Sequence, residues 1–280
     1  MITISFFFFK YFNNPILNQF HDGAILPPTE KKIAFSTDSY TISPLFFPGG
    51  DIGSLAVHGT VNDLAMCGAE PKYLSASFII EEGVSTETLE QITCSMAEAA
   101  QRVGIEVVTG DTKVVEKGDV DGIFINTAGI GFVDHDIHIN PDQAQKGDII
   151  VLNGPIGNHG ISILASRENL QLKQVIASDT APLPDLVHQM LSITKEIHVL
   201  RDPTRGGLAS ALNELAEKSM VSLWLEEKLI PIAPPVYAAS ELLGLDPLGV
   251  TCEGRVILGV KKEKAEEVLQ AITSCLLYTS

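Results

Sequence analysis

The chain has 280 residues, of which 45% are hydrophobic and 19% charged, a composition typical of a soluble globular protein and not of a disordered one. Its formal charge is −16, from 19 Lys and Arg against 35 Asp and Glu, which disfavours nucleic acid and anionic membranes as partners. Four cysteines without paired spacing argue against a disulfide framework, and no apolar run reaches the roughly 20 residues of a membrane span. These features predict a cytoplasmic protein.

Strands and helices alternate along the first half of the chain. Four short runs rich in β-branched and aromatic residues predict strands, at 32–40, 73–80, 106–109 and 122–132. Between the second and third of these, residues 86–103 repeat apolar side chains at helical spacing, which predicts an amphipathic helix with Leu89, Ile92, Met96 and Ala99 on its buried face.

The same alternation starts again after the turn Lys146-Gly147-Asp148, so we place a boundary there between two domains, 1–145 and 146–280. The second half predicts, in order, these elements: a strand at 149–153, a helix from about Ile161, a helix over 185–196, a helix after Gly206-Gly207, a proline-rich connector at 231–235 and a strand at 255–260. The fold class expected is α/β or α+β in both domains.

Three acids stand where an apolar run meets a turn: Asp38, Asp63 and Asp111. Singly, each has an ordinary structural explanation, because Asp38 and Asp111 can form turns, and Asn62 or Asp63 can cap a helix that enters 64–67. Together, oxygen ligands from separate strand ends suit Mg²⁺. In a chain this acidic, an anionic substrate such as ATP needs metal ions, backbone N–H groups or a few well-placed cations.

Lys113 stands two residues beyond Asp111, so on an extended strand both side chains point to the same side. It could contact phosphate or the reacting group; the alternative is an exposed surface lysine. The glycine-rich segment 46–53 matches neither a P-loop nor a dinucleotide fingerprint, so we favour a plain loop over a phosphate cradle.

Two segments of the second half combine functional residue types. Arg201-Asp202-Pro203-Thr204-Arg205-Gly206-Gly207 precedes a helix and predicts an anion site; the alternative is ordinary helix capping by Thr204. Cys252-Glu253-Gly254-Arg255 opens the last strand, where Glu253 could be a general base if its surroundings are dry. We interpret Cys252 as structural and leave His159 unassigned.

In their order along the chain, these motifs resemble the HypE family of hydrogenase maturation proteins, from about Lys10 to Ile272. The aspartates alone would identify only the wider PurM-like superfamily of aminoimidazole ribonucleotide synthetase, selenophosphate synthetase and thiamine-monophosphate kinase. Two motifs are more particular to HypE: Ser36-Thr-Asp-Ser-Tyr40 with Phe46-Phe-Pro-Gly-Gly50, and Arg201-Asp-Pro-Thr-Arg-Gly-Gly207.

The resemblance implies a two-domain PurM-like fold. Its N-terminal domain dimerises through its sheet into a shared β-barrel, and its C-terminal α/β domain closes over the nucleotide. It also implies ATP and Mg²⁺ as cofactors, with Asp38, Asp63 and Asp111 as metal ligands. By position, Lys113 and Glu253 match the proton-transfer groups. The nucleotide site would comprise the three aspartates together with Asn62, Asp202, Thr204 and Arg205.

The activity implied is ATP-dependent dehydration of a carbamoyl group, placed on a cysteine by HypF, to a thiocyanate. The cyanide then reaches the iron of [NiFe] hydrogenase through a HypC–HypD complex. Two alternatives stay open. One is another PurM-like enzyme that phosphorylates a small molecule, of the selenophosphate synthetase or thiamine-monophosphate kinase type. The other is a non-catalytic nucleotide-binding scaffold.

The sequence departs from the family at both ends. A His-Gly-Ser-Gly-Gly segment expected near the start and a Pro-Arg-Ile-Cys tail are absent, and Cys275 differs in context from the tail cysteine. We therefore expect a fragment of a longer reading frame, which binds nucleotide poorly and is inactive on itself as written.

Overall fold

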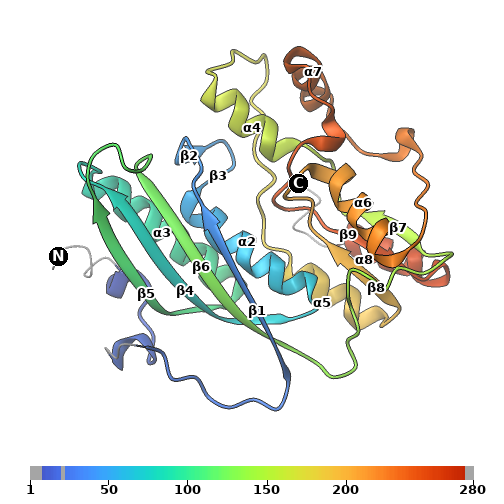
Figure 1. The fold of residues 1–280 in the computed structure, drawn as a ribbon, viewed down its shortest axis with the longest axis horizontal. Helices are drawn as coiled ribbons and strands as arrows, with labels where there is room; N and C mark the ends of the chain where they lie inside the picture. The colour runs from blue at the N-terminus through green and yellow to red at the C-terminus, as the bar shows by residue number, and fades with distance from the viewer. Residues whose placement is uncertain (1–7, 20–22, 275–280) are drawn as a thin grey trace.

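The structure is a computed structural model that describes residues 8–19 and 23–274; Cys275 lies outside these ranges. The chain forms two halves, each built on its own sheet, that lie side by side (Figure 1). Among the described residues, no helix combines the length and apolar character needed to cross a membrane.

The first half contains a four-stranded sheet in the order β1-β6-β4-β5. Strands β4 and β5 are parallel, as expected for a pair joined by a helix, and the other neighbours are antiparallel. All four predicted strands are confirmed, with these bounds: β1 Lys32–Tyr40, β4 Glu70–Glu81, β5 Glu106–Val115 and β6 Ile123–Val133.

Helix α3 (Thr86–Val103) joins β4 to β5 and matches its prediction residue for residue. Ser85 caps its start by accepting a hydrogen bond from the Thr88 N–H, and Gly104 ends it in the left-handed conformation. The apolar positions predicted for its inner face are all buried, namely Leu89, Ile92, Met96 and Ala99.

Helix α2 (Ile52–Met66) is longer than the sequence suggested. The expectation that Asn62 or Asp63 caps a helix entering 64–67 is wrong, because both lie inside α2. The helix starts at Asp51, whose carboxylate accepts from the Ser54 N–H while the Ser54 hydroxyl bonds back to the Asp51 backbone.

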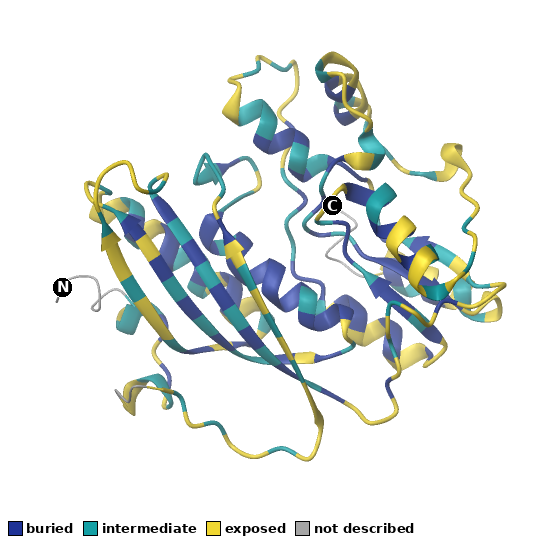
Figure 2. Cartoon of the chain, viewed as in Figure 1, coloured by how far each residue is buried: buried dark blue, intermediate teal, exposed yellow. Residues whose placement is uncertain are grey.

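Helix α2 is also the element that joins the two halves. Its first part packs beneath the first sheet with α3, and its last turn, with Leu64 and Met66, packs against α5 (Pro184–Ile193) and the second sheet. Figure 2 shows α2 buried along nearly all of its length. The position of Asp63 is therefore fixed by both halves.

The second half is built on a three-stranded antiparallel sheet in the order β7-β9-β8. Its strands are β7 Ile149–Leu152, β8 Ile197–Arg201 and β9 Ile257–Val260. Besides α5, its helices are α4 Asn158–Arg167, α6 Gly207–Ser219, α7 Pro234–Leu243 and α8 Ala265–Ser274. Single 3₁₀ turns occur at Leu17–Gln19, Glu227–Leu229, Pro247–Gly249 and Lys262–Lys264.

Three expectations for this half are wrong. The helix predicted over 185–196 ends at Ile193, and β8 follows it unpredicted. The connector at 231–235 contains the start of α7, because proline is tolerated in a first helical turn. Helix α4 begins at Asn158, one turn before the predicted start. The boundary at 145/146 stays a prediction; we propose that it lies in the segment between Val133 and Ile149.

Candidate functional site

Four acidic side chains from both halves face one another where the halves meet. Asp38 lies on β1, Asp63 on α2, Asp202 directly after β8, and Glu253 four residues before the start of β9. Their electrostatic coupling is mutual: the charges of Asp38 and Asp63 both raise the pKa of Asp202 and of Glu253. The fold thus gathers carboxyl groups that stand far apart in the sequence.

This proximity changes how the acids ionise. Burial, reinforced by the charge of Asp63, raises the pKa of Asp202 to about 6. Burial and then the charges of Asp202 and Asp179 raise the pKa of Glu253 well above its ordinary value. Burial also raises the pKa of Asp63, against the hydrogen bond that its carboxylate accepts from the Ser36 hydroxyl at 2.7 Å. The burial of Glu253 and its acidic neighbours thus both favour the protonated form of this carboxyl, an environment typical of acid–base groups.

Cationic and helix-dipole groups border the acids. The Arg205 guanidinium lies 3.7 Å from the Asp38 carboxylate and remains 83% exposed, so it can also reach a ligand. Helix α6 begins after Gly206 without a side-chain cap, which makes the alternative of capping by Thr204 wrong. The uncapped N–H groups and Arg205 together suit an anion.

Asn62 connects the halves beneath Glu253. Its amide nitrogen donates to the carbonyls of Ala181 (3.0 Å) and Glu253 (3.1 Å), and its oxygen accepts from the Leu183 N–H at 2.7 Å. The side chain is only 1% exposed. Its polar atoms are thus used within the protein, and Asn62 supports the backbone of Glu253.

Asp111 and Lys113 lie elsewhere, on β5 at the opposite edge of the first sheet from Asp38. Three strand spacings of about 4.8 Å separate β1 from β5, or about 14 Å. Among the residues that the structure describes, no three His, Cys, Asp or Glu side chains converge into a metal site. Within one chain, therefore, Asp111 does not join Asp38 and Asp63. The expectation of three strand-end acids is wrong for Asp63, which lies in α2, and for Asp111, which lies in the middle of β5.

A cavity of about 590 Å³ also lies along β5, and none of the four acids lines it. Asp111 and Lys113 line it together with apolar groups that include Phe8, Phe12 and Leu17. Both β5 side chains are exposed, so one chain alone shows Lys113 as the surface lysine of the alternative interpretation.

The glycine-rich segment 46–53 is neither a phosphate cradle nor a plain loop. It forms the hairpin of β2 (Phe46–Phe47) and β3 (Gly50–Asp51), and its turn packs on the second half. The Pro48 carbonyl accepts from the Ser178 N–H at 2.7 Å, and a Cβ on Gly49 would lie 2.7 Å from the Ser178 carbonyl oxygen. The protein's own backbone fills the space that a phosphate would need.

Two other candidates are structural. The His159 ring is buried and its Nδ1 lies 2.8 Å from the Ser178 hydroxyl, while burial lowers its pKa to about 4. Cys252 is fully buried, its Sγ accepts from the Gly157 N–H, and burial raises its pKa to about 12. The structural interpretation of Cys252 is confirmed. His159 is an uncharged, buried residue that packs between helix α4 and the segment at Ser178.

Sequence reasoning missed Asp179, whose carboxylate meets the Glu253 backbone and Arg255. It stands in an irregular segment without apolar periodicity or a motif, so no local signal marks it. Only a pairing across 74 residues of sequence makes it part of this site.

Replacing Asp202 by asparagine is expected to stabilise the ligand-free protein. The folded-state pKa of Asp202, about 6, exceeds its ordinary 3.8, so ionisation costs stability as the pH rises from about 4 to about 6. Asp202→Asn should therefore raise the free energy of unfolding at pH 7.5 by about 1–3 kcal/mol. Urea denaturation at pH 4 and 7.5 measures this, with Asp119→Asn in an exposed turn as control. A gain of equal size at both pH values would contradict the account.

The chain is similar to known proteins in both sequence and structure. The AIR synthase related protein models match residues 20–133 (N-terminal domain) and 145–277 (C-terminal domain). The carbamoyl dehydratase HypE of Azotobacter vinelandii is 52% identical over 265 residues, which cover 95% of this chain and 78% of that protein. A crystal structure of hydrogenase maturation protein HypE in complex with ATP has a TM-score of 0.94 and 46% identity, covering 98% of this chain and 81% of that one. In a HypE–HypF complex the matching chain has a TM-score of 0.87 and 44% identity, over 100% of this chain and 90% of that one.

Proposed function

The chain belongs to the AIR synthase related protein family and, within it, to the family of the carbamoyl dehydratase HypE, and from this we propose that it uses ATP to dehydrate a carbamoyl group on a cysteine sulfur during hydrogenase maturation. Its fold is the two-domain PurM-like fold. The identity of 52% to a carbamoyl dehydratase favours this function over phosphorylation of a small molecule. The observation that carries the proposal is the position of Glu253 at the junction of the halves, where burial and the neighbouring acids Asp202 and Asp179 raise its pKa.

The reaction converts R–S–C(=O)–NH₂ and ATP into R–S–C≡N, ADP and phosphate. An amide oxygen is a poor leaving group, but it departs readily once it carries the γ-phosphoryl group, and it leaves within the phosphate. The amide nitrogen gives up two protons, one of which ends on the phosphate and one in solution. A group that accepts protons from nitrogen is therefore needed next to the carbamoyl carbon, and Glu253 is our candidate.

The acids that the structure describes at the junction do not form a complete metal site by themselves, so we propose that Mg²⁺ binds there together with phosphate oxygens. Burial, and after it the charges of neighbouring acids, raise the pKa values of Asp63, Asp202 and Glu253, and a divalent cation would relieve the repulsion among these acids. We assign Asp38 and Asp63 as its ligands in this chain, with Asp202 beside them. When bound, Mg²⁺ would offset the charge on the transferring phosphoryl group.

Phosphate oxygens would meet Arg205 and the start of α6. The Arg205 side chain extends into solvent from the border of the acids, and α6 offers N–H groups that no side chain caps. Thr204 and Asp202 lie in the turn that leads into this helix. This segment therefore supplies positive potential inside an otherwise acidic surface.

We propose a homodimer formed through the uncovered face of the first sheet. Helices α2 and α3 cover one face of this sheet (Figure 1). The opposite face carries exposed apolar side chains. Ile33 and Phe35 on β1 are 63% and 67% exposed, and Ile79 on β4 is 41% exposed. A second copy packed on this face would bury them and form the shared barrel implied by the family.

The same dimer accounts for Asp111 and Lys113. They lie on β5, about 14 Å from β1 of their own chain by strand spacing, at an edge that a partner subunit can approach. We propose that each subunit's Asp111 and Lys113 complete the other subunit's site, Asp111 at the metal and Lys113 at the reacting group. The predicted roles then hold, but across the dimer.

Partners follow from the family. A solved relative forms a HypE–HypF complex, so we propose HypF as the donor of the carbamoyl group and a HypC–HypD complex as the acceptor of the cyanide. A cytoplasmic location fits these partners.

Coupling between ATP and the carbamoyl group tests the proposed function. The full-length protein is given Mg-ATP and a peptide with an S-carbamoylcysteine, and phosphate release is followed. We expect release that depends on the carbamoyl group, with one phosphate per peptide. Equal release with the unmodified cysteine peptide, or ATP binding without turnover, would favour the nucleotide-binding scaffold instead.

A further inference from the structure

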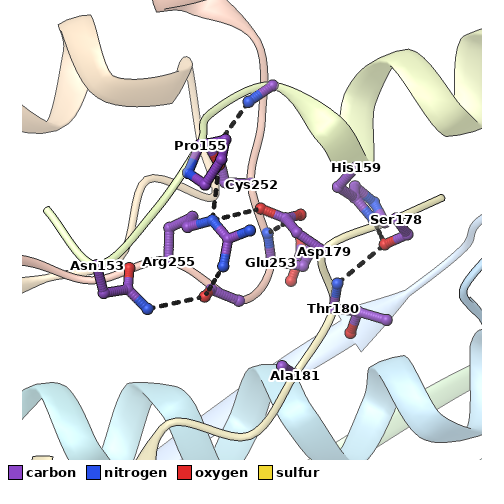
Figure 3. Close-up of polar contacts among 12 residues, drawn as sticks. Asn153, Pro155, His159, Ser178, Asp179, Thr180, Ala181, Cys252, Glu253 and Arg255 are labelled. Atoms are coloured by element: carbon purple, nitrogen blue, oxygen red, sulfur yellow. Dashed lines mark hydrogen bonds and ion pairs between the residues drawn. The ribbon is translucent and has the colours of Figure 1, made fainter. Parts of the chain in front are cut away.

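Asp179 makes two contacts behind Glu253. One carboxylate oxygen accepts a hydrogen bond from the Glu253 backbone N–H at 3.1 Å, and the other lies 3.4 Å from Arg255 Nε (Figure 3). The ion pair is enclosed, with 1% of the Asp179 side chain and 12% of the Arg255 side chain exposed. Asp179 thus touches the backbone of the proposed acid–base residue without touching its carboxyl.

The backbone around Glu253 is held on its other sides as well. Arg255 donates to the carbonyls of Pro155 at 2.7 Å and Gly254 at 3.1 Å, and Asn153 donates to the Gly254 carbonyl at 3.3 Å. Asn62 donates to the Glu253 carbonyl itself. The N–H of Glu253 donates to Asp179, so both polar backbone groups of Glu253 are held by side chains.

The segment that carries Asp179 is fastened to both halves of the molecule. The Ser178 hydroxyl lies 2.8 Å from His159 Nδ1 on α4, and the Thr180 hydroxyl lies 3.1 Å from His58 Nδ1 on α2. Gly254 packs so closely on this segment that a Cβ there would overlap the Asp179 carbonyl oxygen. The carboxylate of Asp179 therefore has a fixed position relative to α2 and to Asp63 on it.

The buried Asp179–Arg255 ion pair is not well explained as a device for stabilising the fold. Enclosing a carboxylate and a guanidinium removes both from water, and apolar side chains of similar size often stabilise a fold as well or better. One Asp179 oxygen, moreover, has no hydrogen-bond partner among the described residues. A buried pair of this kind is explained better by the geometry that it imposes on its neighbours than by the energy that it contributes.

We propose that Asp179 is the positioning residue for Glu253: it accepts the Glu253 N–H and, oriented by Arg255, fixes where the Glu253 side chain leaves the backbone. The inference rests on the proposed function, because it matters for catalysis only if Glu253 exchanges protons with the substrate. A shift of about 1 Å in a reacting group can cost on the order of 100-fold in rate.

Two substitutions at the same position separate this role from simple charge pairing. Asp179→Ala and Asp179→Asn both remove the charge opposite Arg255, but only asparagine keeps an oxygen that can accept the Glu253 N–H. With the full-length protein, Mg-ATP and the S-carbamoylcysteine peptide, we expect alanine to lower kcat about 30- to 100-fold. Asparagine should retain kcat within about fivefold of the wild type. In both variants the ATP concentration at half-saturation should change less than about threefold, because neither touches the nucleotide site.

Equal kcat losses in the two variants would overturn the proposal, because the loss of the charge opposite Arg255 would then account for the whole effect. So would an alanine variant with wild-type kcat, or losses in which ATP half-saturation rises in parallel with the fall in kcat. If the alanine variant does not fold, Asp179→Val fills the volume without an acceptor and replaces it in the comparison. A wild-type protein without carbamoyl-dependent turnover would overturn the proposed function itself, and with it this inference.

Discussion

Replacement of Glu253 by glutamine is expected to lower carbamoyl-dependent turnover by a factor of about 10²–10⁴. The amide has the size of the acid but cannot accept and release a proton in the working pH range. ATP binding should stay within about threefold of the wild type, because Asp38, Asp63 and Arg205 hold the nucleotide in our account. Single-turnover phosphate release and ATP titration measure the two quantities separately.

The pH dependence of the turnover rate tests the role of Glu253 independently. Burial and neighbouring acids raise the pKa of Glu253 well above its ordinary value, and only the carboxylate accepts a proton from the amide. The wild-type rate should therefore rise with pH through that pKa, and Glu253→Gln should lack the rise. Glu226→Gln, an exposed acid of the same half, is the matched control. A Glu253→Gln protein with more than about a tenth of the wild-type rate would remove Glu253 from the mechanism.

Asp63→Asn and Lys113→Ala are each expected to abolish turnover, and a mixture of the two is expected to regain about one quarter of it. The reason is the proposed dimer, in which Lys113 of one subunit serves the acids of the other. A heterodimer then keeps one intact site, formed by the Lys113→Ala subunit's acids and the Asp63→Asn subunit's lysine. Half of randomly assembled dimers are heterodimers, and each has one working site of two.

A second mixture, of two variants in the same acid cluster, controls for recovery of turnover that does not depend on a shared site. Asp38→Asn and Asp63→Asn affect acids of the same cluster, so their heterodimer has no intact site and should stay inactive. Co-expression with two affinity tags provides each heterodimer in pure form. An inactive heterodimer of Asp63→Asn with Lys113→Ala would show that these residues do not work across the dimer.

The elements that could be predicted are those whose sequence pattern lies within the element itself. Helix α3 has one buried face, a capping serine and a terminal glycine, so its period and bounds stand in the sequence. Helix α2 is buried at 13 of its 15 positions, because it packs on the sheet and on the second half at once. Such a helix has no polar face and hence no helical period to detect. Strand β8, with five residues, was too short to separate from the helix before it.

The site divides in the same way. Asp38, Asp63, Asp202 and Glu253 were found because each stands in a motif, and the structure brings these four together. The placement of Asp111 and Lys113 could not be predicted, because the order β1-β6-β4-β5 arises from pairings between distant strands. Asp179 was missed for a related reason, because its role depends on a contact with Glu253, which is 74 residues away in the sequence.

Mass spectrometry of the S-carbamoylcysteine peptide is the most direct test of the central claim. After incubation with the full-length protein and Mg-ATP, the account predicts a peptide lighter by the mass of one water, with a thiocyanate at the cysteine. Omission of ATP or substitution of Glu253 should prevent that change. A peptide of unchanged mass, in a reaction that nevertheless consumes ATP, would contradict the claim.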